Sequence, residues 1–190
     1  MKITAGVDEV GRGSLMGPVY AAAVILNSSI DIKLLKDSKS IAKDKRELLS
    51  NYIKKNSTWA VGKASVKEID KINILQASLL AMKRAVKKLK IKPSHILIDG
   101  NKVPDLKNYN LKAVIKGDQK IPSISAASII AKVSRDKFIS TLAKNNKGYG
   151  LDQNFGYGTK QHLTAIKKLG INKHHRKTFS PISRLKTHNI

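Results

Sequence analysis

Apolar and polar residues alternate in blocks along this 190-residue chain, and the pattern predicts both strands and helices. Two apolar runs rich in Val, Ile and Ala span 2–8 and 18–26, with glycines and a proline between them, which indicates strand, turn and strand. A third strand is predicted over 58–66. Shorter apolar runs at 95–99 and 111–117 predict a fourth and a fifth strand.

Apolar residues recur at helical spacing between and after these strands. They predict helices over 40–56, 72–89, 122–144 and 159–169. Ser40 is expected to cap the first helix, and a proline at a favourable first position opens the third. Helices interleaved with strands predict an α/β fold, in which a mixed sheet carries helices on its faces.

The length of the chain fits one domain. A Gly- and Asn-rich loop at 145–158 is the only candidate boundary, and the segment after it is too short to fold by itself. We therefore expect a main core over 1–146 and a C-terminal loop and helical extension over 147–190, both in the same domain.

The opening "MKITAGVDEV" reaches acidic residues too early to contain the apolar core of a signal peptide. The longest apolar run, "VYAAAVIL", is far shorter than a membrane span. The chain has no cysteine, which excludes disulfides, thiolate zinc sites and thiol catalysis. These features predict a cytoplasmic protein that does not contact a membrane.

The chain is strongly basic, with 37 Lys plus Arg against 13 Asp plus Glu and a formal charge of +24. Such a balance predicts a positive surface field that attracts polyanions, and nucleic acid is the first partner to consider. Nearly all the basic residues are lysines, so a genome rich in lysine codons would produce the same balance without any such partner.

Three acids stand out because each ends an apolar, strand-like segment: Asp8, Glu9 and Asp99. Burying an ionised carboxylate is costly without a cation or several hydrogen-bond donors. Hard oxygen ligands on rigid elements are what a magnesium site requires. The alternative is that these acids accept hydrogen bonds from loop amides or cap the next helix.

Strand geometry limits how the first two acids can cooperate. Successive side chains of a strand point to opposite faces, so Asp8 and Glu9 cannot both reach one metal ion from a regular strand. Either the strand is distorted there, or Glu9 contributes through its backbone carbonyl or from the edge of the site.

Several other residues suit a ligand that carries phosphate and sugar groups. Gly11 and Gly13 fit neither a dinucleotide nor a P-loop motif, but they let the backbone approach a ligand closely, with Arg12 near phosphate. Tyr157 could stack on a sugar or base, and Lys39 in "DSK" could bind phosphate. The alternatives are a tight turn, ordinary loop packing and a solvated turn, respectively.

The five histidines show no zinc-binding spacing. The segment "HHRKTF", 174–179, is predicted to be a basic surface segment that contacts nucleic acid.

Taken together, six segments resemble one family in its order along the chain. They are "GVDEVGRGSLMGPV", "KDSKS", "ILIDGN", "KGDQKIPSISAASIIAKVSRD", "GYGTKQH" and "HHRKTFSPI". The chain thereby resembles ribonuclease H type 2, the bacterial ribonuclease HII. The sister type 3 enzymes usually have lysine at the position of Arg12, so "GRG" favours type 2.

The resemblance implies a ribonuclease H-like five-stranded mixed sheet flanked by helices, with a small helical C-terminal extension. It implies an endonuclease that depends on Mg²⁺ or Mn²⁺ and hydrolyses the RNA strand of RNA–DNA hybrids, including single ribonucleotides embedded in duplex DNA. We expect a monomer that acts by two-metal-ion hydrolysis and leaves 5′-phosphate and 3′-hydroxyl ends. The rival functions are a non-catalytic basic nucleic-acid-binding protein and another nuclease of the same fold.

The resemblance also assigns residues. It places the catalytic acids at Asp8, Glu9, Asp99 and Asp118, the first three of them as metal ligands. Asp136 competes with Asp118 for the fourth place, and we expect it instead to pair with Arg135 or a neighbouring lysine. For substrate binding, the resemblance implies that the backbone of Gly11, Arg12 and Gly13, with Tyr157, recognises the 2′-hydroxyl and that Lys39 binds a phosphate.

Overall fold

The computed structural model describes residues 3–35 and 42–185. Their elements follow the alternation that the apolar pattern predicts. The strands are β1 (Thr4–Val10), β2 (Val19–Leu26), β3 (Ser57–Ala64), β4 (His95–Asp99) and β5 (Asn110–Val114). The helices are a 3₁₀ turn η1 (Ile32–Leu35), α1 (Lys43–Lys55), α2 (Val66–Lys87), α3 (Gly117–Lys120), α4 (Pro122–Lys144), α5 (Leu151–Asn154), α6 (Lys160–Leu169) and α7 (Ile182–Leu185).

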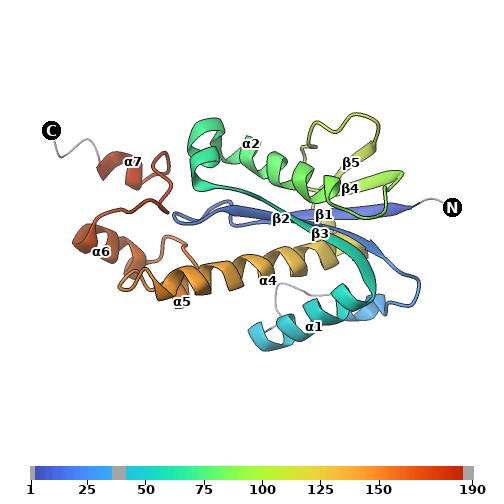
Figure 1. Ribbon diagram of the computed structural model, residues 1–190, viewed down its shortest axis with the longest axis horizontal. Helices are drawn as coiled ribbons and strands as arrows, with labels where there is room; N and C mark the ends of the chain where they lie inside the picture. Colours follow the sequence, from blue (N-terminus) through green and yellow to red (C-terminus); the bar gives the residue numbers. More distant parts are fainter. Residues whose placement is uncertain (1–2, 36–41, 186–190) are drawn as a thin grey trace.

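The five strands form one mixed sheet in the order β3-β2-β1-β4-β5. β1 and β2 are antiparallel, as are β2 and β3, whereas β1, β4 and β5 run parallel. Helix α2 covers one face of the sheet, and α4 covers the other with α1 packed beside it (Figure 1). The predicted five-stranded mixed sheet with flanking helices is confirmed.

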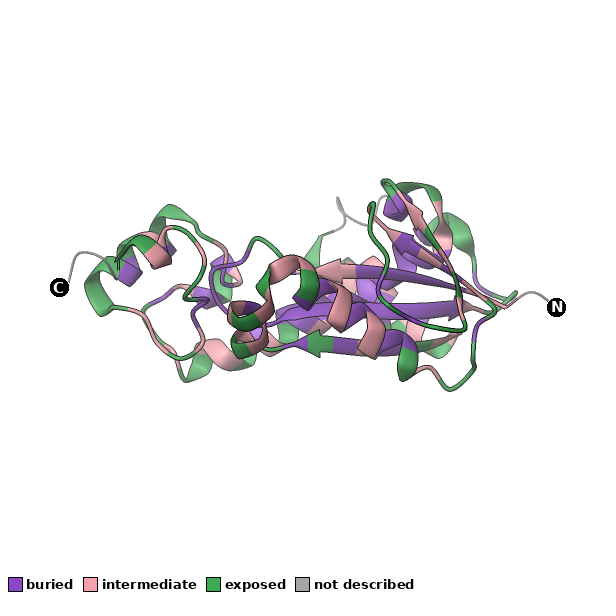
Figure 2. Cartoon of the chain, turned by 90° about the horizontal axis from the view of Figure 1, so that it is seen from above, coloured by how far each residue is buried: buried purple, intermediate pink, exposed green. Residues whose placement is uncertain are grey.

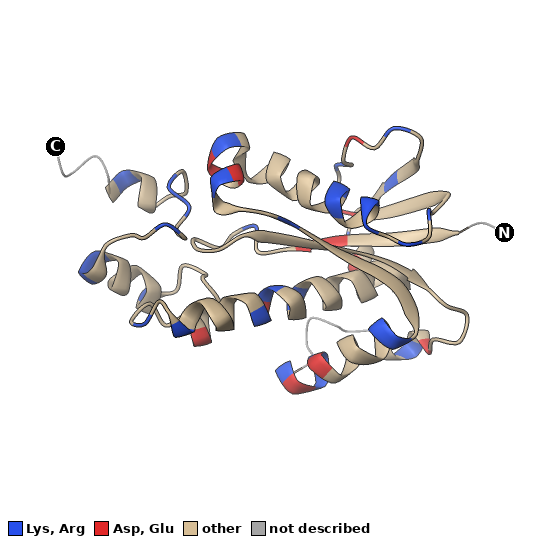
Figure 3. Ribbon diagram, viewed as in Figure 1, with Lys and Arg blue, Asp and Glu red and all other residues tan. Residues whose placement is uncertain are grey.

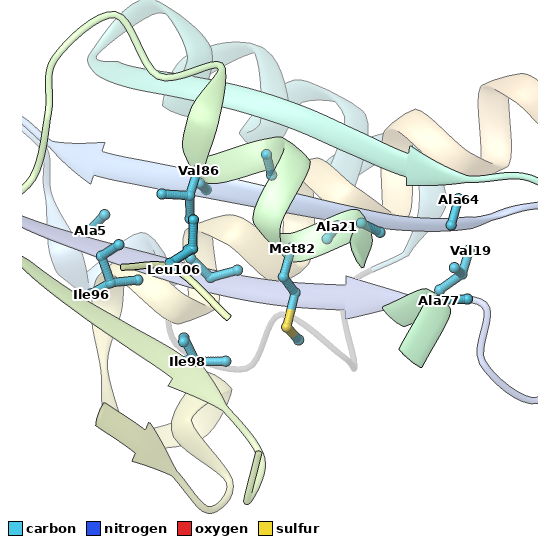
Figure 4. Close-up of a cluster of buried hydrophobic side chains, with 14 of the residues drawn as sticks. Ala5, Val19, Ala21, Ala64, Ala77, Met82, Val86, Ile96, Ile98 and Leu106 are labelled. Atoms are coloured by element: carbon cyan, nitrogen blue, oxygen red, sulfur yellow. The ribbon is translucent and has the colours of Figure 1, made fainter. Parts of the chain in front are cut away.

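The apolar core lies in two layers, one on each side of the sheet, and the two central strands β1 and β2 are mostly buried (Figure 2). On the α2 side, inward residues of β1, β2 and β4 pack against the helix (Figure 4). The α4 side is made from alternate residues of β2, from residues of α1 and from an apolar stripe of α4, with Val10 of β1 and Val61 of β3 packed against them. Alanines occupy three consecutive positions of β2, 21–23, and their small side chains let both helices approach the sheet.

Two glycines allow a closer approach still. A Cβ atom on Gly6 of β1 would lie 2.2 Å from the backbone of Ser123, and one on Gly62 of β3 would lie 2.2 Å from the carbonyl oxygen of Ala81. Backbone therefore meets backbone where α4 crosses β1 and where α2 crosses β3. The contact at Gly6 fixes the start of α4 on the strand that carries Asp8.

Several element boundaries differ from the prediction, among them those of α1, α2 and β5. α1 begins at Lys43 with Ala42 at the N-cap and no side-chain cap, and Ser40 lies outside the described residues. α2 begins six residues earlier than predicted, because Ser65 and Glu68 form a capping box. β5 ends at Val114, since the chain turns there into the short helix α3.

The C-terminal part packs on the far end of α4, opposite the N-terminal end of the molecule (Figure 1). Residues of α5, α6 and α7 form a third apolar cluster with Leu15, Met16 and Ile139. The predicted loop at 145–158 contains the single turn α5. Over the described residues, no helix combines the length and the apolar character needed to traverse a lipid bilayer.

Candidate active site

Two of the predicted acids lie side by side at one edge of the sheet. β1 and β4 are parallel, with Val7 opposite Ile98, and both of these residues belong to the core on the α2 side. The next residues, Asp8 and Asp99, therefore point to the α4 face from adjacent positions. Parallel strands bring their carboxyl ends together, which is why two acids so far apart in sequence meet.

Glu9 points to the other face, as strand alternation requires. It pairs with Ala21, which belongs to the core on the α2 side, and β1 continues regularly to Val10, so the strand is not distorted. Its Oε1 atom accepts a hydrogen bond from Nη1 of Arg12 at 3.2 Å, and its buried Oε2 atom has no partner among the described residues. Glu9 thus contributes from the edge of the site.

All three acids line one cavity of about 250 Å³ between β1, β4 and α4. Figure 3 shows acidic positions within the central sheet, with basic positions on the helices around it. Cations also face this cavity, from α1 and α4. The lining residues are Asp8, Glu9, Val10, Arg46, Asp99, Ser128, Ile129 and Lys132.

Burial and mutual repulsion act on the carboxylates. Burial raises the pKa of Asp8 well above its usual value, the negative charges of Glu9 and Asp99 raise it further, and the Ser128 hydroxyl partly offsets both. Burial also raises the pKa of Glu9, against the opposing effect of Arg12. An arrangement that disfavours its own negative charge is one that a bound cation would stabilise.

The donor set suits a hard divalent cation. Its atoms are carboxylate oxygens, one of them buried without a partner, and no imidazole or thiolate lines the cavity. In the part of the chain that the structure describes, no three His, Cys, Asp or Glu side chains converge as a complete ligand set. Mg²⁺ is commonly held by one or two carboxylates together with water and substrate phosphate, so these residues fit Mg²⁺ or Mn²⁺ in an open site.

Asp118 lies beside the acid pair through its backbone. Oδ1 of Asp99 accepts hydrogen bonds from the amides of Gly117 at 2.7 Å and Asp118 at 3.4 Å. Asp118 is buried, but it lines a second cavity together with residues of η1 and the start of α4, such as Ser125. The structure therefore brings Asp118 close to Asp99 without placing it among the residues of the first cavity.

Asp136 is engaged elsewhere. Its Oδ1 atom pairs with Nζ of Lys132 at 2.9 Å, one turn earlier on α4. This confirms the expected pairing with a neighbouring lysine, and Asp136 does not line the acidic cavity.

The glycine turn and the tyrosine loop meet beside this cavity. Ser14 and Tyr157 form an antiparallel bridge, which joins residues 11–13 to the loop that carries the tyrosine. Gly11 has φ +89°, and a Cβ atom there would lie 2.1 Å from Nε of Arg135, so only glycine fits. Gly13 faces open space, and Arg12 is exposed. Lys39 lies outside the described residues.

The expectation for residues 174–179 is partly wrong. His175 and Arg176 are fully buried rather than exposed, and Lys177 and Thr178 are held by Asp70 of α2. The backbone contacts explain this burial, because the segment docks onto the glycine turn: the amide of Arg176 donates to Leu15, and that of Gly17 to His174.

Some residues of the site escaped sequence reasoning. Ser128 and Lys132 are four apart on α4 and face the acids from one side of the helix, a spacing that the sequence does contain. Arg46 of α1 reaches the cavity only through the packing of α1 against α4, for which the sequence holds no local signal.

Carboxylates at the carboxyl ends of two adjacent parallel strands, in a mixed sheet of this order, are typical of a nuclease with the ribonuclease H-like fold. The family model described as Ribonuclease HII matches residues 5–182. The chain belongs to the ribonuclease HII family, as its six motifs implied.

Known ribonucleases are similar to this protein along nearly the whole chain. The ribonuclease HII of Pelagibacter ubique is 78% identical over 97% of this chain and 100% of its own length. The crystal structure of ribonuclease H2 from Pyrococcus horikoshii superposes with a TM-score of 0.81, at 28% identity and 97% coverage of both chains. Bst ribonuclease HIII, solved in complex with Mn²⁺, shares the fold with a TM-score of 0.75 at 19% identity, over 98% of this chain and 70% of that one.

Family membership makes this protein a ribonuclease H, an endoribonuclease that acts on RNA–DNA hybrids.

Proposed function

We propose that the cavity between β1, β4 and α4 is the catalytic site, and that it hydrolyses the phosphodiester bond at a ribonucleotide in hybrids and in otherwise all-DNA duplexes. The observation that carries this proposal is the placement of Asp8 and Asp99, which face α4 from adjacent parallel strands. In a chain of charge +24, a buried Asp8 beside a half-buried Asp99 of like charge has no evident structural use.

Asp8 and Asp99 would hold the divalent cation, Mg²⁺ or Mn²⁺, with Glu9 assisting from the edge. When bound, the cation lowers the pKa of water and stabilises the charge that develops on phosphate oxygens. Asp118 is the fourth acid of the proposal, because its backbone already lies against Asp99 whereas Asp136 is paired. The two-metal arrangement and the 5′-phosphate and 3′-hydroxyl products belong to the same proposal.

Basic residues around the cavity would bind the scissile strand. Lys132 lies between Asp136, at 2.9 Å, and the aromatic rings of Phe155 and Tyr157, whose centroids are 5.0 and 6.0 Å from Nζ. Together with Arg46 it gives the acidic cavity a cationic rim that suits a phosphate group. Lys39 is proposed to contact a neighbouring phosphate.

Recognition of the ribose is assigned to the turn at Gly11–Gly13 and to Tyr157. Gly13 leaves the backbone open to close approach, and the bridge from Ser14 to Tyr157 keeps the aromatic ring next to the turn. A 2′-hydroxyl is what separates RNA from DNA at one position, and amides next to a ring suit a ribose.

The proposal also includes a monomer that acts in the cytoplasm, with residues 1–146 as the catalytic core and 147–190 as an extension of the same domain. The packing of α5, α6 and α7 onto Leu15, Met16 and Ile139 supports a joined unit.

The test compares three duplexes of one sequence: all DNA, DNA with one ribonucleotide, and an RNA–DNA hybrid. With Mg²⁺ or Mn²⁺ we expect cleavage of the last two only, and none in EDTA. Tight binding without cleavage under all conditions would favour a non-catalytic nucleic-acid-binding protein. Cleavage of the all-DNA duplex would favour a nuclease with a different substrate.

A further inference from the structure

Two fully buried arginines flank the glycine turn, Arg135 from α4 and Arg176 from the C-terminal segment. Neither forms an ion pair within the described part of the chain, although buried guanidinium groups normally have a carboxylate partner. Both guanidinium groups donate hydrogen bonds mainly to backbone carbonyl oxygens of residues 11–18. The two arginines therefore hold these carbonyl groups in fixed orientations.

Arg176 binds three carbonyl oxygens with one guanidinium group. Its Nη2 donates to Gly11 at 2.6 Å, its Nη1 to Arg12 at 2.8 Å and its Nε to Gly17 at 3.0 Å. In a trans peptide the N–H points opposite to the C=O. The amides of Arg12 and Gly13, which share peptide groups with the first two carbonyls, therefore point away from Arg176.

These two amides are available for a ligand. No hydrogen bond among the described residues uses the N–H of Arg12 or Gly13. Gly13 faces open space, so nothing in the described fold covers it. Two successive amides that point the same way form a concave site for an anionic or hydroxyl oxygen.

Arg135 joins the same turn to the tyrosine loop. Its guanidinium donates to the carbonyl oxygens of Met16 and Phe155 at 3.1 and 3.0 Å and to Oγ of Ser14 at 2.7 Å. Its Cζ lies 5.5 Å from the ring centroid of Tyr157. One side chain thus contacts both the backbone that follows Gly13 and the ring proposed to contact the ribose.

Simple packing does not account for this arrangement. Burying a charge without a counter-charge is costly, and an apolar side chain of similar size would fill the same space. Burial and, to a lesser extent, the charge of Arg135 lower the pKa of Arg176 to about 9. The benefit that offsets this cost is the fixed orientation of the peptide groups.

We propose that Arg176 and Arg135 are positioning residues for ribonucleotide recognition. Arg176 orients the peptide groups at Gly11 and Arg12 so that the amides of Arg12 and Gly13 face the ribose, and Arg135 keeps Tyr157 beside them. The inference rests on the proposed function and adds to it the residues that prepare the recognition surface before substrate binds.

The test is a cycle of one protein change and one substrate change. Cleavage by wild type and by Arg176→Lys is measured under single-turnover conditions, with Mn²⁺, on duplexes that carry either one ribonucleotide or its 2′-fluoro analogue. Lysine keeps the charge but places all its donors on one nitrogen, so it lacks the planar fork that reaches three separate carbonyls. We expect Arg176→Lys to reduce the preference for the 2′-hydroxyl about tenfold or more, while the dissociation constant for an all-DNA duplex changes less than twofold.

Asp70→Ala is the matched control, because it removes three hydrogen bonds to Lys177 and Thr178 in the same segment and leaves the three hydrogen bonds of Arg176 in place, while also removing a negative charge that acts on Arg176. It should lower the thermal midpoint and keep the preference for the 2′-hydroxyl. Arg176→Gln, which keeps an uncharged hydrogen-bond donor, is measured in parallel. If the lysine variant folds poorly, the glutamine variant still tests the positioning role.

The outcomes separate this inference from the proposed function. An unchanged preference in folded Arg176→Lys or Arg176→Gln would overturn the positioning role. An equal loss in Asp70→Ala would overturn it too, since docking of the segment alone would then explain the effect. Wild type that fails to prefer the 2′-hydroxyl would instead contradict ribose recognition in the proposed function.

Discussion

Lys132 and Asp136 form an ion pair one turn apart on α4, with 2.9 Å between Nζ and Oδ1. The pair points the lysine along the rim of the acidic cavity and keeps the aspartate out of it. Asp136 of α4 thus acts through Lys132, whereas the backbone of Asp118 in α3 contacts Asp99, and this difference separates the two candidates for the fourth catalytic acid.

Asp118→Asn should lower kcat for cleavage at a single ribonucleotide at least a hundredfold, whereas Asp136→Asn should lower it less than tenfold. The reason is that Asp118 lies against Asp99, and Asp136 acts only by orienting Lys132. Steady-state kinetics of the two variants in Mg²⁺ compare them directly. Equal losses, or a larger loss for Asp136→Asn, would reverse the assignment.

Asp8→Asn should abolish cleavage and, without metal, make the fold more stable by about 1–3 kcal/mol. The change removes a buried negative charge that repels Glu9 and Asp99. Thermal unfolding in EDTA measures the gain. Adding Mg²⁺ should raise the midpoint of wild type more than that of the variant, because binding to the native state stabilises by mass action. A variant that is less stable in EDTA and cleaves normally would contradict both parts.

Tyr157→Ala should reduce kcat/KM at a single ribonucleotide about tenfold or more and change binding to an all-DNA duplex less than twofold. Its ring is the aromatic group that the bridge to Ser14 holds beside the glycine turn. Tyr157→Phe is the control that keeps the ring and removes the hydroxyl. Parallel losses in cleavage and DNA binding for Tyr157→Ala would make the residue a packing element.

The thermal midpoint should fall as the pH is lowered from about 6.5 to about 4, because two buried histidines must remain neutral. Nδ1 of His162 donates to the carbonyl oxygen of Tyr157, and Nδ1 of His175 accepts from the amide of Asn172, so the proton on Nε2 of His175 faces Nε2 of His162 at 3.4 Å. A second proton would place two N–H groups against each other.

The sign follows from the pKa values. Burial lowers the pKa of His162, and burial together with the charge of His162 lowers that of His175 to about 4. The unfolded chain then binds more protons below the ordinary value of about 6.5, so stability present above that pH is lost as pH falls. Unfolding curves of wild type and His162→Gln measure this, and a variant with an undiminished pH dependence would rule the pair out.

The main outline of the fold could be predicted because the pattern of apolar residues indicates which segments form strands and which form helices. Five strands and the full extent of α4 follow from runs and periodicity alone. The start of α2 was missed because the backbone leaves helical geometry at Asn73, with φ 64°, so the apolar stripe predicted from residue 72 does not extend back to Val66. The capping box at Ser65 and Glu68 was present in the sequence, directly after a strand-like run, and could have located the true start.

The residues of the active site likewise fall into those that the sequence alone predicts and those that it does not. Asp8 and Asp99 are predictable since each ends an apolar strand, a local signal. Asp118 follows β5 in a single short turn, and only the strand order places it beside Asp99. The burial of Arg135 and Arg176 was not foreseeable from one sequence, because charged side chains are seldom fully buried and their carbonyl partners come from distant segments.

The close contact between Gly6 and Ser123 is possible only because glycine has no side chain. The relative position of the two halves of the active site therefore depends on this glycine. One half consists of the carboxylates of β1 and β4. The other half consists of Ser128 and Lys132 on α4, the helix whose start contacts Gly6. Adding a single carbon at that glycine would lift or slide α4 against the strand and carry the rim away from the acids. An enzyme altered there would lose activity with every reacting group still intact.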